Sequence, residues 1–239
     1  MGGTVEPRFT VELHPDWYLI TIIQEVLMLK SIFGRREEEE RVKEEGRLPP
    51  GQSLTNRFPV LHYGPVPRFN PATWTLRVFG EVDQEVVWSW DEFNKLPRTK
   101  LVMDIHCVTR WSKFDTEWEG VSIKTLVDQG IIKIKPTARY LMQHCEYGFT
   151  VNVPLEVALA PNFLLATHYN GEPLEPDHGY PLRGVIGNVP GTDYKTPYFW
   201  KGGKWIRGLE FMARDRLGFW EQAGYHNEAD VWKEQRFAY

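Results

Sequence analysis

The pattern of apolar and polar positions changes character near residue 50. Before that point, residues 16–33 repeat apolar side chains at intervals of three and four, the spacing of one helical face. Gln24, Glu25 and Lys30 fall on another side, and Gly34 follows as a helix breaker. The pattern predicts an amphipathic helix over 16–33. Its apolar positions are Leu19, Ile22, Ile23, Val26, Leu27 and Leu29.

A strongly charged segment follows this predicted helix. Residues 35–45 mix acidic and basic side chains that can pair four positions apart, but they offer almost no apolar face. We expect a solvated helix or a linker here. The Pro-Pro-Gly run at 49–51 then stops any helix, because proline lacks the backbone N–H that a helix needs. The sequence thus predicts an N-terminal helical arm and charged linker over 1–48, and a domain over 49–239.

Beyond residue 50, short runs of branched and aromatic side chains dominate. The predicted strands are residues 73–82, 85–90, 100–105, 139–144 and 163–169. Longer apolar spacing predicts short helices at 89–95, 122–129 and 155–160. This mixture indicates an α+β domain rich in strands. The sequence has no internal repeat and no Gly-x-Gly-x-x-Gly turn, so no Rossmann-type cofactor site is expected.

Composition and charge narrow the possible partners. With 239 residues, 42% hydrophobic and 14% aromatic, the chain can bury a substantial core. The formal charge of −4 gives no basic excess, so nucleic acid is not an expected partner. Residues 1–9 lack the features of a secretory signal, which predicts a cytoplasmic protein.

The predicted N-terminal helix is not expected to span a membrane. Its apolar stretch, 17–33, is interrupted by charged and polar side chains and is shorter than the roughly 20 residues of a bilayer span. The helix could instead pack on the domain or on a second subunit, which would make a homo-oligomer. Binding to a membrane surface is the alternative.

Cysteine is the scarcest chemically reactive side chain. Only Cys107 and Cys145 occur, so a disulfide framework or a Cys-x-x-Cys zinc pair is excluded. Cys107 ends the apolar run 101–105 and precedes a polar turn, a place where strands deliver functional groups. One thiolate cannot complete a metal site alone, so a metal here needs a cofactor that brings its own sulfur ligands. A buried, inert cysteine is the alternative.

A zinc site is a further alternative, because the chain contains two His-Cys pairs, His106-Cys107 and His144-Cys145. Neighbouring side chains on a strand point to opposite faces, so all four ligands converge only if the backbone is irregular. This geometry disfavours zinc and makes Cys145 a core or pocket-wall residue.

Three further motifs accompany the segment His106-Cys107-Val108-Thr109-Arg110-Trp111-Ser112. They are Phe-Pro-Val-Leu-His-Tyr-Gly-Pro-Val-Pro at 58–67, His-Gly-Tyr-Pro-Leu-Arg at 178–183 and Lys-Gly-Gly-Lys-Trp at 201–205. In this order the motifs resemble the sulfite oxidase family of molybdopterin-binding oxidoreductases, which includes bacterial sulfoxide reductases. The resemblance covers residues from about 50 to 239 and implies a mixed, strand-rich sulfite-oxidase-type fold. It also implies a mononuclear molybdenum–molybdopterin cofactor.

The resemblance further implies roles for individual residues. Cys107 matches the family's only protein thiolate ligand to molybdenum, and two more sulfurs come from the pterin dithiolene. Arg110, three residues later, is a candidate to attract an oxyanion substrate. The residues that match pterin and phosphate ligands are His62, His178, Arg183, Lys201, Gly202, Gly203 and Lys204.

Two departures from the family pattern affect the expected pocket. The segment 184–197 is longer and more polar than in relatives, which predicts a reshaped mouth. The family's active-site tyrosine aligns with Phe149, and Tyr147 could replace it if the strand register shifts by two.

These roles imply two-electron oxygen-atom transfer on a small sulfur- or nitrogen-oxo substrate, in an undecided direction. Because the chain has no Cys-x-x-Cys-His haem motif and lacks the family's C-terminal dimerisation domain, we expect a separate electron-transfer partner. Two alternatives stay open: a molybdopterin-binding or carrier protein without turnover, and a structural domain with an inert Cys107.

Overall fold

The computed structural model describes residues 34, 36–193 and 197–238, which fall into two compact units, Met1–Gly46 and Arg47–Tyr239. In the first unit, residues 36–44 are helical. Ion pairs four residues apart support this helix, with Lys43 Nζ 3.0 Å from a Glu39 carboxylate oxygen. The amphipathic helix predicted over 16–33 lies outside the described residues.

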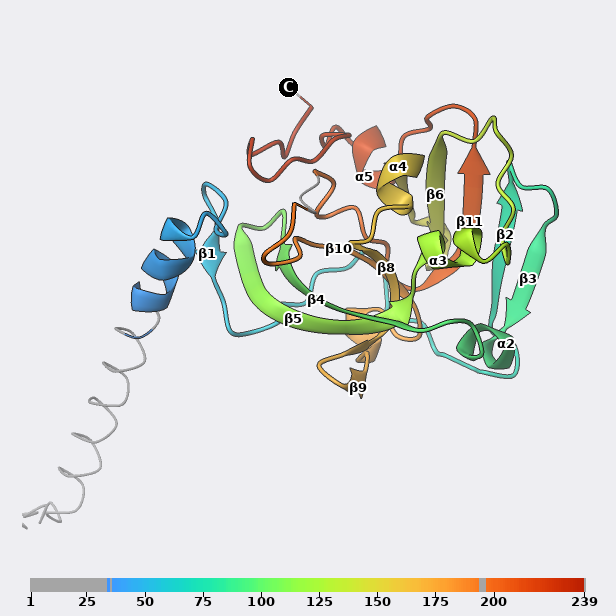
Figure 1. The fold of residues 1–239 in the computed structure, drawn as a ribbon, viewed down its shortest axis with the longest axis horizontal. Coiled ribbons are helices and arrows are strands. Elements are labelled where there is room, and N and C mark those ends of the chain that lie inside the picture. Colours follow the sequence, from blue (N-terminus) through green and yellow to red (C-terminus); the bar gives the residue numbers. More distant parts are fainter. Residues whose placement is uncertain (1–33, 35, 194–196, 239) are drawn as a thin grey trace, which may run out of the picture. The chain divides into compact units, whose positions relative to one another are not determined.

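Two β-sheets form the second unit (Figure 1). The first sheet has six strands, and β5 lies at its centre between β1, β4 and β8. Its strands are β1 (Ser53–Leu54), β4 (Thr99–His106), β5 (Trp111–Val121), β8 (Phe163–Tyr169), β9 (Glu172–Pro173) and β10 (Arg183–Ile186). The second sheet runs in the order β3 (Val86–Ser89), β2 (Thr75–Gly80), β11 (Ile206–Met212), β6 (Tyr140–Cys145) and β7 (Thr150–Pro154).

Short helices connect the strands, and local side chains fix their ends. Ser89 and Glu92 form a reciprocal capping box at the start of α2, and Ser122 caps α3. The helical elements are α2 (Trp90–Asn94), α3 (Ile123–Asp128), α4 (Leu155–Ala158) and α5 (Phe219–Gln222), with 3₁₀ turns η1 (Glu146–Gly148) and η2 (Pro176–His178). Among the described residues, no helix has the length and apolar character needed to cross a bilayer.

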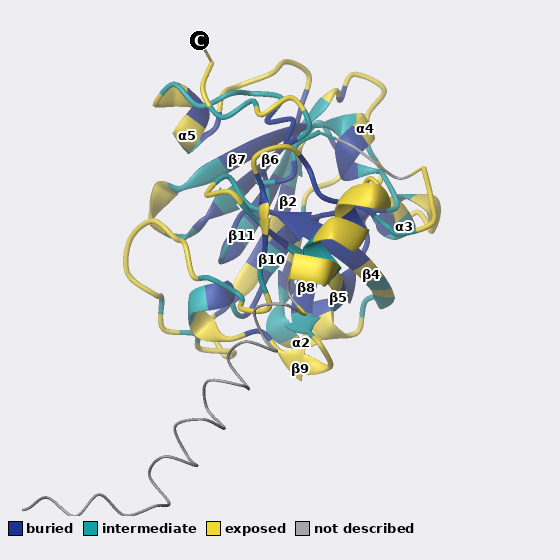
Figure 2. Cartoon of the chain, turned by 90° about the vertical axis from the view of Figure 1, so that its left-hand side faces the viewer, coloured by how far each residue is buried: buried dark blue, intermediate teal, exposed yellow. Residues whose placement is uncertain are grey.

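Buried residues concentrate in the strands, and exposed ones in the connecting loops (Figure 2). The larger of two hydrophobic clusters contains Phe93, Leu141 and Phe163, all fully buried. The second contains Trp118 and Met103 on β5 and β4. This second cluster supports the end of the hairpin that carries Cys107.

The predicted α+β class is confirmed, and each predicted strand overlaps an observed one. Strands β5, β7, β10 and β11 and the two-residue strands β1 and β9 were not predicted. In β5 the inward face carries Ser112 and Thr116, both fully or almost fully buried, so apolar and polar positions do not alternate cleanly. The hydroxyl of Thr116 donates to the Met103 carbonyl and accepts from the Trp118 indole, which removes the penalty of burying it.

Candidate active site

Cys107 lies in the tight turn that joins β4 to β5. The Cys107 N–H donates to the Trp111 carbonyl at 2.9 Å, and the Arg110 N–H donates to the Cys107 carbonyl at 3.0 Å. Arg110 has a positive φ of 70° and closes the turn. The Cys107 sulfur lies 3.2 Å from the Thr109 hydroxyl oxygen. The hairpin therefore presents the sulfur at the end of a well-anchored strand.

A chain of hydrogen bonds holds this turn from behind. Asn188 Nδ2 lies 3.4 Å from His106 Nε2, and His106 Nδ1 lies 2.7 Å from the Ser112 hydroxyl. The Ser112 hydroxyl donates to Gln52 Oε1, and Gln52 Nε2 donates to the Cys107 carbonyl at 3.2 Å. Burial, with a smaller effect from the Arg47 charge, lowers the pKa of His106 to about 3. His106 is thus neutral near pH 7 and serves as one link of the chain.

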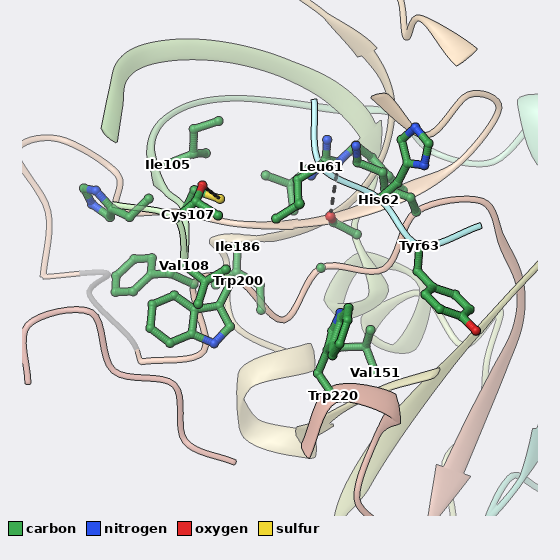
Figure 3. Close-up of a pocket in the computed structure, with 18 of the residues that line it drawn as sticks. Leu61, His62, Tyr63, Ile105, Cys107, Val108, Val151, Ile186, Trp200 and Trp220 are labelled. Carbon is green, nitrogen blue, oxygen red and sulfur yellow. Dashed lines mark hydrogen bonds between the residues drawn. The ribbon is translucent and has the colours of Figure 1, made fainter. Parts of the chain in front are cut away.

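A cavity of about 330 Å³ opens beside Cys107 (Figure 3). This volume is within the range of small-molecule and cofactor sites. Its wall comes from β4 and its turn, β10, the 58–63 loop, the 199–205 segment and α5. Most of the lining is apolar or aromatic, including Phe58, Leu61, Tyr63, Ile105, Val108, Trp111, Phe149, Val151, Ile186, Phe199, Trp200, Trp220 and Tyr225.

Two cations, Arg183 and Lys204, interrupt this apolar wall. They face each other across an isolated β-bridge between β10 and the 201–205 segment. Burial lowers the pKa of Arg183 to about 10, and a negative charge on Cys107 opposes that effect. Burial, followed by repulsion from Arg183, lowers the pKa of Lys204 to about 7. Both pKa values respond to Cys107, so the two cations and the sulfur share one electrostatic environment.

Both cations keep donors available to a ligand. Arg183 Nη1 donates to the His178 carbonyl at 3.0 Å, while Nη2 has no hydrogen-bond partner within the described part of the chain. The Arg183 guanidinium also lies over the Trp118 ring, 5.3 Å from its centroid, which fixes its plane. Lys204 Nζ donates one bond, to the Asp177 carbonyl at 2.7 Å. This wall suits a buried anionic group.

The glycines of the Lys-Gly-Gly-Lys turn are required by chain packing. A Cβ on Gly202 would lie 2.2 Å from the Gly184 carbonyl oxygen, and one on Gly203 would lie 2.6 Å from the Cys145 sulfur. The Gly184 N–H donates to the Gly203 carbonyl at 2.8 Å. Gly202 lines the cavity and Gly203 does not. The turn therefore presses against β10 and sets the distance between Lys204 and Arg183.

The structure brings five predicted site residues into one cavity wall and places five elsewhere. His62, Cys107, Arg183, Gly202 and Lys204 line the cavity. The others lie outside the lining: Arg110, Tyr147, His178, Lys201 and Gly203.

Two of the residues outside the lining support the wall from behind. Lys201 is only 1% exposed and forms an ion pair with Glu221, 3.0 Å away. His178 is buried, stacks on Phe58 at a centroid distance of 3.9 Å, and offers its carbonyl to Arg183. Burial, with a smaller effect from Lys204, lowers the pKa of His178 to about 4.

The other departures concern the substrate candidates. The Arg110 side chain is exposed. Tyr147 is 53% exposed and has a positive φ of 58° within η1. Tyr147 does not share a strand face with Phe149, because residues 146–148 form a 3₁₀ turn and not a strand. Phe149, two residues later, lines the cavity instead.

The zinc alternative fails on geometry. Cys145 is buried in the larger hydrophobic cluster, and burial raises the pKa of its thiol strongly. His144 Nε2 contacts the Glu210 carboxylate at 2.7 Å. In the described ranges, the only group of potential metal ligands within reach of one another comprises Glu175, Asp177 and His178, and it includes neither cysteine.

Several lining residues were not predicted as site residues. Trp200, Trp220 and Glu221 form part of the wall, and Glu221 also pairs with Lys201. Trp200 directly precedes the predicted Lys201 turn, which is a usable signal in the sequence. Trp220 and Glu221 belong to α5, which contacts β7, a strand that lies far earlier in the chain. No local sequence pattern indicates that α5 reaches the cavity.

Comparisons with known proteins fit this site. The family model described as "Oxidoreductase molybdopterin binding domain" matches residues 63–220. The chain is 42% identical over 208 residues to the uncharacterized oxidoreductase YuiH of Bacillus subtilis, covering 87% of this chain and 98% of that protein.

More distant relatives carry named activities. Human mitochondrial sulfite oxidase is 25% identical over 74% of this chain, and the catalytic subunit MsrP of the Campylobacter jejuni protein-methionine-sulfoxide reductase is 23% identical over 64%. The chain spans only 37% and 54% of these two relatives.

A solved structure shares the fold. The crystal structure of the sulfane dehydrogenase SoxCD from Paracoccus pantotrophus matches with a TM-score of 0.53 and 20% sequence identity. The match covers 65% of this chain and 42% of that one. At this identity the likeness shows the fold alone.

Proposed function

The chain belongs to the oxidoreductase molybdopterin-binding domain family, and we propose that it catalyses two-electron oxygen-atom transfer on a small sulfur- or nitrogen-oxo substrate. The observation that supports this most is the shared wall of Cys107, Arg183 and Lys204 in one cavity. A soft sulfur ligand and an anion site are the two features that a metal-bearing, phosphorylated pterin requires.

The residues present fit the molybdenum–molybdopterin cofactor of the family. The cavity is large enough, and Arg183 Nη2 and two of the three Lys204 ammonium hydrogens are free to receive a phosphate. The indole N–H groups of Trp111 and Trp200, which both belong to the lining, have no hydrogen-bond partner in the described ranges. Buried donors without partners are uncommon in a protein whose site is complete without a ligand.

The cofactor, when bound, supplies the two-electron redox chemistry, and this chain's residues set its environment. We assign Cys107 as the metal's protein ligand, with the hydrogen-bonded chain from Asn188 to Gln52 holding its backbone in place. Arg183, Lys204, His62 and the backbone at Gly202 would hold the pterin and its phosphate.

The residues outside the lining have supporting roles in this proposal. Lys201 fixes α5 to the Lys-Gly-Gly-Lys turn through Glu221, and His178 and Gly203 hold Arg183 and β10 in register. Arg110 and Tyr147 were predicted to orient the substrate, and we assign that role to the cavity wall instead.

Metal and pterin analysis of three proteins tests the proposal: the wild type, Cys107→Ser, and Cys145→Ala as a matched control. We expect the wild type and Cys145→Ala to hold molybdenum and pterin in equal amounts. Cys107→Ser should keep the pterin and lose turnover, because a serine oxygen is a harder and poorer ligand than a thiolate. A wild-type protein without molybdenum, from cells supplied with ample molybdate, would overturn the proposal.

One observation favours a second candidate, a molybdopterin-binding or carrier protein without turnover. The family's active-site tyrosine is replaced by Phe149, which brings no hydroxyl group into the cavity. Loaded protein that shows no redox change with any electron donor or acceptor would favour this role.

We further propose that electrons pass to or from a separate protein partner and that the protein works in the cytoplasm. The chain has only two cysteines and no haem-binding motif, and both cysteines are free thiols. Cell fractionation checks the location, and copurification with a redox protein checks the partner.

A further inference from the structure

We infer that the substrate is a neutral oxo compound with an apolar substituent, such as a sulfoxide, and not an oxyanion such as sulfite. This inference rests on the proposed function and deepens it. It follows from the charges in the cavity and from the side chains at its mouth.

The cavity has few positive charges to offer an anionic substrate. Besides His62 and His106, its lining contains two basic side chains, Arg183 and Lys204. Both ring nitrogens of His106 already contact other side chains, Ser112 and Asn188. The pKa of Lys204 is about 7, so at neutral pH it is only partly protonated before a ligand binds. The one lining carboxylate, Glu221, is already paired with Lys201. Lys201 is fully committed to that pair and to Asn152 and Asn227.

The cofactor itself consumes this positive charge. A phosphate monoester carries about −1.5 to −2 near pH 7, which offsets most or all of the charge of Arg183 and Lys204 together. A second anion would then enter a low-dielectric cavity without a partner, which is strongly unfavourable. Arg110, the predicted anion-binding residue, is exposed and outside the lining.

The rest of the wall suits a neutral, partly apolar molecule. Figure 3 shows Cys107 with Ile105, Val108, Ile186 and Trp200 on one side of the cavity, and Trp220 and Val151 on another. None of these side chains except Cys107 can carry a charge. A sulfoxide needs no counter-ion, and its apolar substituent would gain from burial against such a wall.

An aromatic mouth extends this apolar surface to solvent. Tyr63 and Trp220 line the cavity and are 47% and 42% exposed. Trp220 packs against Tyr225 at a centroid distance of 5.3 Å, and Tyr63 and Phe149 each lie within 6.5 Å of Trp220. Leu61, 52% exposed, continues the surface along the 58–63 loop that also carries Tyr63. Such a rim can bind an alkyl or aryl group whose oxo end reaches toward Cys107.

The reaction balances as a two-electron exchange. A sulfoxide takes up two electrons and two protons, its sulfur–oxygen bond breaks, and a thioether and one water are released. The electrons come from a one-electron donor, provided in the assay by two equivalents of reduced viologen. The reverse direction oxidises a thioether with oxygen from water and passes two electrons to an acceptor.

The test uses molybdenum-loaded protein and compares neutral with anionic ligands. We expect kcat/KM for methyl phenyl sulfoxide to exceed that for sulfite or nitrate by at least about tenfold. Added sulfate should not inhibit, and kcat/KM for the sulfoxide should not change with ionic strength. As a readout without turnover, calorimetry on the oxidised protein should detect binding of methyl phenyl sulfide and none of sulfate.

Variants locate the effect at the aromatic mouth. Trp220→Ala should lower kcat/KM about tenfold for methyl phenyl sulfoxide and much less for dimethyl sulfoxide, because only the aryl group loses a ring contact. Val87→Ala, at an exposed apolar position on β3 outside the lining, should change neither. Measuring kcat/KM for a short peptide that contains methionine sulfoxide shows whether the protein prefers the sulfoxide of a peptide side chain or a free small-molecule sulfoxide.

The possible failures are distinguishable. Protein that contains molybdenum and turns over sulfite faster than any sulfoxide, or that binds sulfate in calorimetry, would overturn the neutral-substrate inference and leave the proposed function intact. Protein that holds no molybdenum would overturn the proposed function itself.

Discussion

Replacing Lys201 by methionine should lower the free energy of unfolding. Its main effect should be on stability and not on cofactor binding. Lys201 Nζ lies 3.0 Å from the Glu221 carboxylate, 3.0 Å from Asn152 Oδ1 and 2.9 Å from the Asn227 carbonyl oxygen. Burial lowers the pKa of Lys201, but the Glu221 charge opposes that effect. Methionine fills most of the space and leaves the Glu221 carboxylate, whose side chain is 6% exposed, without its cation.

The magnitude follows from the burial of the pair. Breaking a buried ion pair by removing one partner typically costs about 3–5 kcal/mol of unfolding free energy. For a chain of this size each kcal/mol corresponds to about 2–4 °C in melting temperature, so we expect a fall of about 6–20 °C. The double variant Lys201→Met/Glu221→Gln should regain at least about 2 kcal/mol, because it leaves no lone buried charge.

Urea unfolding and thermal melting of cofactor-free protein measure both variants. Lys124→Met is the control, because Lys124 pairs with Asp128 at 2.6 Å on an exposed helix face and should contribute less than about 0.5 kcal/mol. If the unfolding free energy of Lys201→Met matches that of the wild type within about 0.5 kcal/mol while its pterin content falls, Lys201 acts on the cofactor directly and not through Glu221.

Two further predictions concern the cationic wall. The pKa of Lys204 is about 7, and a bound phosphate favours its charged form, so affinity for the pterin phosphate should fall as pH rises above about 7. In equilibrium binding measurements, Lys204→Arg should remove this pH dependence. A pH dependence that persists in the variant would contradict the role of Lys204. Gly202→Ala places a methyl group 2.2 Å from the Gly184 carbonyl oxygen. We therefore expect a loss of about 1–3 kcal/mol in unfolding free energy together with a lower pterin content. An unchanged melting temperature would show that the turn can shift to accommodate the methyl group.

Sequence patterns predicted the parts of the fold that are governed by local signals. The strands that became β2, β3, β4, β6 and β8 are marked by branched or aromatic residues, and the capped helices after Ser89 and Ser122 carry their own start signals. Strand β5 escaped detection because Ser112 and Thr116 are buried with satisfied hydroxyl groups, a pairing that only the tertiary structure reveals.

The same distinction applies to the site: local motifs identify its lining residues, but not the contacts that the tertiary structure makes. The motif residues at 62, 107, 183, 202 and 204 meet in one cavity, because the fold brings together the end of β4, the start of β10 and the segments 58–63 and 199–205. Lys201 stands beside them in sequence, but its side chain turns to Glu221 on α5, a residue 20 positions away that no local spacing connects to it. Tyr147 fails for a backbone reason, since a residue with φ of 58° does not share a face with Phe149.

X-ray absorption at the molybdenum edge counts the sulfur atoms bound to the metal and so shows whether Cys107 is a ligand. We expect three sulfur neighbours in the loaded wild type, two from the pterin and one from Cys107, and two in Cys107→Ser. An unchanged sulfur count in the variant would mean that Cys107, the cysteine that lines the cavity, is not a ligand to the metal.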